Sequence, residues 1–249
     1  VQANNDIADI QREISQTYRH IEAVESYFTE NELLDNYCNL FFNINGNIEA
    51  IKEKLNKEEN KTKWIKSFFE NFVDLTHSAK SIVSNKNITE ITNLFFVCNE
   101  ANWKLVLLTM FNKGEVSGEI FKKILKLLEI LCFKLKLGDY RTDYLPHYAK
   151  RYFNSADSYN IENLYQDIKN VTEAGFKWYW NDGDRFKNII INYFDNEKWH
   201  YNRNTIKFVL WQYENSLRHK NRSGALLDKE LYNIYTIEHI KPQNPTNEE

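Results

Sequence analysis

The chain has 249 residues, enough for one large domain or two smaller ones. Aromatic residues make up 15% of it, with only 7 glycines and 3 prolines, a composition that excludes an intrinsically disordered chain and a turn-rich all-β fold. The formal net charge of -3 excludes a compact, strongly basic nucleic-acid-binding module, so any contact with nucleic acid must use a local patch.

The cysteines Cys38, Cys98 and Cys132 lie far apart among apolar residues. Because none of them belongs to a Cys-x-x-Cys pair, we expect reduced, buried thiols in a cytoplasmic protein. The most apolar stretch, residues 121–137, carries too many lysines for a membrane span. The chain starts at Val1 without a signal-peptide pattern, and we interpret it as a fragment of a larger protein.

Apolar residues recur at three- and four-residue steps along most of the chain, which is the period of one helical face. Residues 4–28 therefore predict a long amphipathic helix, residues 44–47 break the pattern, and residues 56–63 are interpreted as a charged helix end and loop. The clearest pattern, in residues 118–137, is apolar on more than one side and indicates a buried helix. Further helices are predicted over residues 48–55, 64–79, 89–98, 103–111, 161–171, 186–194 and 206–217. The apolar face of the first helix consists of Ile7, Ile10, Ile14, Tyr18, Ile21, Val24 and Phe28.

Two segments differ from this helical pattern. Residues 139–148 are interpreted as a linker, with His147 in a surface loop. Residues 232–240 alternate β-branched and aromatic residues with polar ones before two prolines, which predicts a strand. The sequence thus predicts a mainly α protein: an irregular multi-helix domain over residues 1–225, and a short C-terminal β element that begins a second domain over residues 226–249.

An adjacent carboxylate and imidazole, Glu238 and His239, stand at the end of the predicted strand, just before Pro242. Since neighbouring strand residues face opposite sides, a bend at the strand end would let one side chain bind a metal ion while the other addresses a water molecule. Histidine is the natural base near neutral pH. Taken without context, such a pair is more often structural than catalytic, so its surroundings decide.

Those surroundings resemble a known family. Residues 236–245, with the sequence TIEHIKPQNP, are similar to the first strand of the ββα-metal (HNH) nuclease motif, in the version found in GmrSD-like, modification-dependent (type IV) restriction endonucleases. Residues 107–111, 127–129 and 138–144 resemble the helical region that links this family's two signature domains. The resemblance implies a DNA endonuclease for defence against foreign or modified phage DNA.

The resemblance also implies roles for individual residues. His239 would be the general base, and Glu238 would be a ligand of Mg²⁺ or a similar divalent ion. The chain departs from the family by stopping at Glu249, before the rest of the metal site, and by lacking the N-terminal nucleotide-hydrolysing domain. We therefore expect this fragment to be inactive and to bind no cofactor. The implied partners are modified DNA and the two missing parts of the protein, without a membrane, and an oligomer is compatible with the sequence.

Two alternatives stay open. A helical DNA- or protein-binding module without catalysis would use the basic run that contains Arg218, Lys220 and Arg222, although such a run often serves only as a solvated helix end. A HEPN-type ribonuclease would use Arg141 and His147, which have the spacing of that family's helical site. Against it, the proline directly before His147 is expected to break the helix that such a site requires.

Overall fold

A computed structural model describes residues 2–44, 46–97, 102–138, 144–155, 158–174, 188, 191–192 and 203–221. These residues are mainly helical, as the sequence predicts, and they include no strand. The predicted β element at the C-terminus lies outside the described residues. None of the described helices combines the length and apolar character that a membrane crossing needs.

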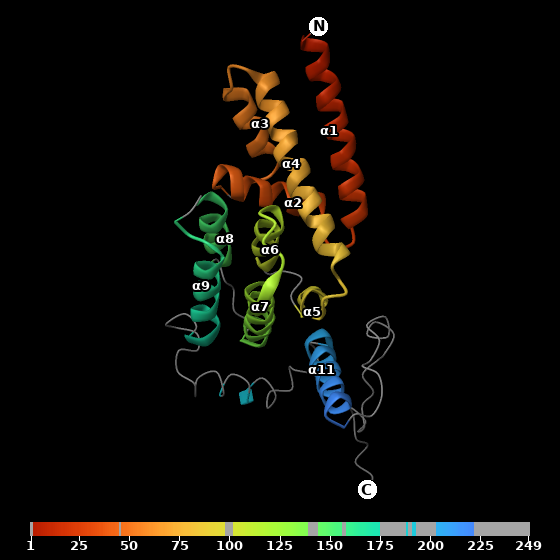
Figure 1. Cartoon of the computed structure of the whole chain (residues 1–249), viewed down its shortest axis with the longest axis vertical. Coiled ribbons are helices and arrows are strands. Elements are labelled where there is room, and N and C mark those ends of the chain that lie inside the picture. Colours follow the sequence, from red (N-terminus) through yellow and green to blue (C-terminus); the bar gives the residue numbers. More distant parts are fainter. Residues whose placement is uncertain are drawn as a thin grey trace, which may run out of the picture.

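The first four helices form an elongated N-terminal arm, which stands above the other helices in Figure 1. Its elements are α1 (Gln2–Val24), α2 (Glu30–Tyr37), a π-helical turn (Cys38–Phe42), α3 (Ile48–Lys57) and α4 (Lys61–Ser84). The remaining described helices form the helical body: α5 (Thr89–Val97), α6 (Trp103–Asn112), α7 (Gly118–Gly138), α8 (Tyr144–Asn154), α9 (Ile161–Ala174) and α11 (Arg203–Asn221).

Helices α1 and α4 pack against each other in parallel. Near their N-termini, Lys66 Nζ lies 3.1 Å from Asp9 Oδ2, and further along, His20 Nδ1 lies 3.2 Å from Thr76 Oγ1. Residue numbers rise together on both helices, so the two run in the same direction. The chain must therefore return to the far end of the arm between them, and α2, the π-helical turn and α3 provide that return path (Figure 1).

Short polar caps set the boundaries of the arm helices. Thr29 and Glu32 form a reciprocal capping box at the start of α2. Asn60 Oδ1 accepts a hydrogen bond of 3.0 Å from the backbone nitrogen of Lys63 at the start of α4. The break predicted over residues 56–63 is therefore shorter than expected, because an asparagine inside it begins the next helix.

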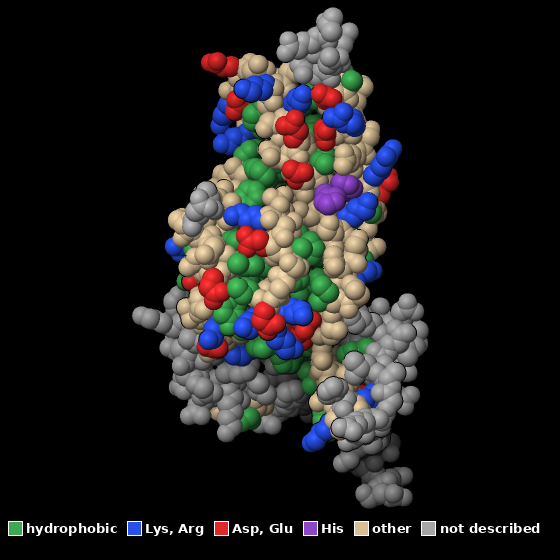
Figure 2. Space-filling model, viewed as in Figure 1, with side chains coloured by type: hydrophobic (Ala, Val, Ile, Leu, Met, Phe, Trp, Pro, Cys, Tyr) green, Lys and Arg blue, Asp and Glu red, His purple; other side chains and the backbone are tan. Residues whose placement is uncertain are grey.

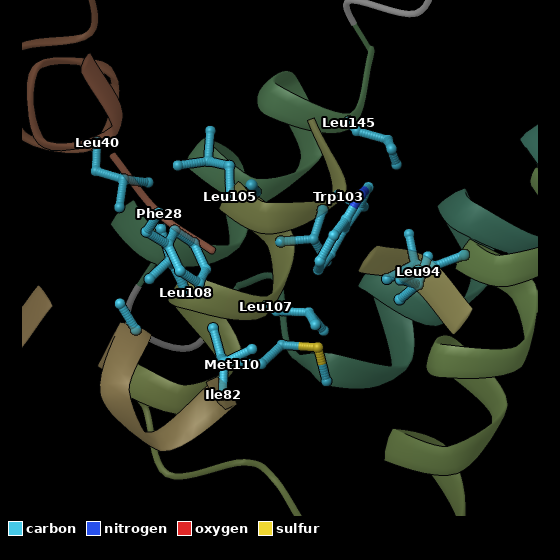
Figure 3. Close-up of a cluster of buried hydrophobic side chains, with 14 of the residues drawn as sticks. Phe28, Leu40, Ile82, Leu94, Trp103, Leu105, Leu107, Leu108, Met110 and Leu145 are labelled. Carbon is cyan, nitrogen blue, oxygen red and sulfur yellow. The ribbon is translucent and has the colours of Figure 1, made fainter. Parts of the chain in front are cut away.

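Helix α6 is the centre of the core. Every residue from 103 to 110 is buried, and α4 and α8 pack on it (Figure 3). Trp103 has no exposed surface, and Leu94 and Leu145 are buried with it in the same cluster (Figure 3). A helix that is apolar nearly all round is stable only when it is surrounded, and α6 meets that condition.

Two expectations need correction. Residues 144–148 belong to α8, so the predicted linker is too long and His147 lies in the first turn of a helix, not in a loop. Pro146 is tolerated there because the first backbone N–H groups of a helix have no partner within it. The first helix ends at Val24 instead of Phe28, and two members of its predicted apolar face, Ile7 and Tyr18, are 54% and 58% exposed.

Candidate functional site

The Glu238–His239 pair lies outside the described residues, as do Arg141 and Arg222. The structure therefore neither brings the predicted catalytic residues together nor separates them. What it describes is the helical region before the motif, and the polar groups which that region buries or exposes.

Helix α11 is the last described element before the motif. It packs on the helical body through Phe208 and Trp211, which are buried, and the Phe208 ring centroid lies 5.8 Å from that of Phe133 on α7. Helix α11 also contacts α5. Residue Tyr213, on the opposite side, is exposed. The predicted helix is present, but the apolar spacing that predicted it does not mark its packed side, because Leu210 and Tyr213 belong to that spacing and are 49% and 62% exposed.

The basic run of the interaction-module alternative begins on the last turns of α11. Arg218 Nε donates to Glu214 Oε1 at 2.8 Å, one turn earlier on the same helix. Lys220 is exposed. A phosphate that approached Arg218 would have to compete with the Glu214 carboxylate, so this arginine is less suited to DNA contact than the sequence alone indicates.

The histidine of the HEPN alternative lies on a helix. His147 is exposed on α8, with its ring centroid 5.9 Å from that of Tyr148. Pro146 stands in the first turn of α8, so it does not keep His147 off a helix. The other half of the proposed pair, Arg141, lies outside the described residues.

Two charged side chains are buried in the body, and each is fully engaged. Lys104 Nζ donates to the backbone oxygen of Tyr27 at 2.7 Å and to Glu32 Oε1 at 2.8 Å. Glu129 accepts hydrogen bonds from Asn93 at 3.0 Å and from Lys126 at 2.9 Å. Lys126 lies on the same helix as Glu129, but Tyr27, Glu32 and Asn93 lie on other segments than the charges they satisfy, so these hydrogen bonds join neighbouring helices.

The cysteines in the described part of the chain, Cys38 and Cys132, are buried thiols, as predicted. Burial, followed by the nearby Asp35 carboxylate, raises the pKa of Cys38 to about 11. The thiolate is the reactive form, so Cys38 is suited to packing and not to nucleophilic chemistry. Cys98 lies outside the described residues.

Sequence reasoning missed a polar cluster between α1 and α4. Figure 2 shows histidine side chains gathered over these two helices, beside basic ones. The ring centroids of His20 and His77 lie 5.6 Å apart, and the His20 side chain is only 6% exposed. Burial, then Lys80 and His77, lower the pKa of His20, while the Val73 carbonyl opposes that shift. Thr17 and His20 stand one turn apart on α1, but two polar residues at this spacing do not indicate by themselves that their side of the helix is buried.

The described residues contain no group of three or more His, Cys, Asp or Glu side chains that could hold a metal ion. Comparisons of the chain with protein-family models, with curated proteins and with solved structures found no match. The C-terminal sequence motif is therefore the observation on which a function can be proposed.

Proposed function

We propose that this chain is part of a metal-dependent DNA endonuclease of the HNH type, similar to GmrSD-like restriction endonucleases, that acts on foreign or modified DNA. The observation that carries the proposal is the segment TIEHIKPQNP at residues 236–245. It combines an acid, an adjacent base and a proline-bounded loop after a strand-like pattern. The preceding chain is mainly helical, which is what the resemblance implies for the region upstream of the nuclease motif.

In this proposal His239 removes a proton from the water molecule that attacks the phosphorus atom of a DNA phosphodiester. A carboxylate oxygen is a donor that Mg²⁺ prefers, so Glu238 fits a role as one ligand of such an ion. The ion would supply stabilisation of the negative charge on the phosphate and on the leaving oxygen. Imidazole, which changes protonation near neutral pH, suits the task of base better than the carboxylate does.

Helix α11 is a rigid element that could support the nuclease motif in this proposal. Phe208 and Trp211 fasten it to the body, and the motif follows it in the chain. A catalytic segment needs support from a rigid element, because small displacements of a base from its water molecule reduce the rate strongly. We infer that α11 supports the nuclease motif on the helical body.

The test is DNA cleavage by the natural full-length protein that contains this chain. Plasmid and modified phage DNA are incubated with Mg²⁺ or Mn²⁺, and wild type is compared with His239→Ala and Glu238→Gln. We expect His239→Ala to lose about 10²- to 10⁴-fold in rate, the usual contribution of general base catalysis. Circular dichroism establishes that each variant is folded.

His147→Ala is the matched control. This exposed histidine on α8 has no role in the HNH proposal, so DNA cleavage should be unchanged. Loss of RNA cleavage in this variant, with no DNA cleavage by wild type, would favour the HEPN alternative. Undiminished DNA cleavage by folded His239→Ala, or no cleavage of any DNA by the intact protein, would contradict the HNH proposal.

A further inference from the structure

The contact between α1 and α4 has a polar middle. Thr17 and His20, one turn apart on α1, are 4% and 6% exposed. The Thr17 hydroxyl finds no hydrogen-bond partner among the described residues. An unpaired buried hydroxyl costs free energy, so this contact is less favourable than the apolar contacts around α6.

The hydrogen bonds around Thr76 determine which tautomer neutral His20 adopts. The Thr76 hydroxyl donates to the Val73 backbone oxygen at 3.0 Å, so its own oxygen is left to accept from His20 Nδ1, 3.2 Å away. Neutral His20 therefore carries its hydrogen on Nδ1 and a lone pair on Nε2. A second proton must be added at Nε2, inside the contact between the helices.

The surroundings of His20 disfavour that second proton. On α4, the helix against which α1 packs, Lys80 and His77 both oppose a positive charge on the ring, and burial opposes it more. The neighbouring charged side chains on α1 itself, Arg19 and Glu22, are exposed to solvent. The Val73 carbonyl is the one group that favours the charged ring, and its effect is the smallest.

We propose that His20 is a proton-operated latch between α1 and α4. Neutral His20 donates to Thr76 across the contact, whereas doubly protonated His20 keeps that donor but adds a positive charge inside the contact, which releases α1 from α4. The release is local, because α1 packs chiefly on α4 while the buried core around α6 stays intact. This inference does not depend on the nuclease proposal.

The direction of the pH effect follows from proton binding. In released α1, His20 has its ordinary pKa near 6.5, and in the closed contact its pKa is lower. The released form thus binds more protons between these two values, and acid favours it. Attachment is complete above pH ~6.5 and weakens as the pH falls below that value, by at most about tenfold per pH unit for one proton.

A second titrating contact on α1 acts in a different range. Lys66 lowers the pKa of Asp9 from its ordinary 3.8, chiefly by a hydrogen bond, so the ion pair between them persists down to more acidic solutions. Loss of this pair cannot account for a change between about pH 7 and pH 5. That range therefore isolates the effect of His20.

The test is amide hydrogen exchange of the full chain between about pH 7.5 and pH 5, corrected for the intrinsic pH dependence of exchange. We expect the protection of α1 amides to fall below pH ~6.5 by up to about tenfold per pH unit, while α6 amides keep theirs. NMR of the His20 ring should show the Nδ1–H form at neutral pH and a pKa below 6.5.

Three variants make the test specific. His20→Gln keeps a donor toward Thr76 but cannot take up a proton, so the pH dependence of α1 should disappear. His77→Gln, a change at its exposed neighbour, should retain the pH dependence over a narrower range, because His77 also lowers the pKa of His20. Lys80→Met removes a positive charge and should raise the pKa of His20, which narrows the pH range of release.

Three results would overturn the latch: a His20 pKa at or above 6.5, an Nε2–H neutral form, or the same acid-dependent loss of α1 protection in His20→Gln. If His20→Gln does not fold, wild type and Lys80→Met still decide: burial alone lowers the pKa of a structural histidine, whereas a latch also requires the acid-dependent loss of α1 protection to be smaller in Lys80→Met.

Discussion

Lys104 carries an ammonium group into the junction between the arm and the helical body. Its Nζ donates to the Tyr27 carbonyl and to Glu32, and lies 5.1 Å from the centroid of the Phe28 ring. Glu32 also belongs to the capping box of α2. A single side chain on α6 therefore joins the end of the α1 segment to the start of α2, and a buried ammonium is tolerated only because its acceptors are in place.

We expect Lys104→Ala to lower the free energy of unfolding by about 2 kcal/mol, because the Tyr27 carbonyl loses this donor and the lysine methylenes leave a void. Solvent reaches Glu32, so loss of the ion pair itself contributes only part of that value. Urea denaturation measures the change. Lys104→Met, which keeps the methylenes without the charge, separates packing from hydrogen bonding and should lie between wild type and the alanine variant. An alanine variant as stable as wild type would refute this role.

At the level of elements, the attachment of α11 depends on few side chains. Phe208→Ala removes a buried ring beside Phe133 and is expected to lower the free energy of unfolding by about 3 kcal/mol. If α11 supports the nuclease motif, DNA cleavage by the full-length protein should fall as well. The control is Tyr213→Ala on the opposite side of the same helix. Tyr213 is 62% exposed, so its loss should change the free energy of unfolding by less than about 0.5 kcal/mol. Equal effects of both variants would exclude attachment through the Phe208 side.

The sequence predicted most helices well wherever the apolar period was long, as in α4, α7 and α9. It predicted no helix for α2, which is short, although the Thr29–Glu32 capping pattern was a readable signal. It predicted no helix for α8 either and assigned residues 139–148 to a linker with a helix-breaking proline, although a proline in the first turn of a helix costs no hydrogen bond. The π-helical turn before Asn43 has no sequence signature of this kind, since it depends on tertiary packing.

Over the whole molecule, stability is expected to be uneven. Helix α6 is buried along its length, whereas α1 is attached to α4 through a contact with a polar middle. Amides of α6 should therefore exchange only through global unfolding, and amides of α1 through local release at lower free energy. Hydrogen exchange at neutral pH and increasing urea distinguishes the two, because local release depends little on urea. Equal protection and equal urea dependence in both helices would show a single cooperative unit instead.

The candidate site was predictable only in part, for a physical reason. Glu238 and His239 are recognisable as a motif because their chemistry depends on residues adjacent in the chain. The His20–Thr76 contact joins residues on different helices, and no local sequence pattern indicates which side of α1 packs against α4. The apolar stripe of α1 suggested an inward face, yet Ile7 and Tyr18 remain exposed while Thr17 and His20 are buried.

The parallel course of α1 and α4 has a consequence for synthesis of the protein. The partners of Asp9 and His20 follow them by 57 and 56 residues, so α1 is made well before the helix that it packs against. At a translation rate of about 5–20 residues per second, α1 waits several seconds for α4. During that time the isoleucine side chains of α1 cannot pack against α4, so they are exposed and chaperones can bind them. Helix α1 therefore docks only after α4 has been made, although it is the first helix of the arm in the chain.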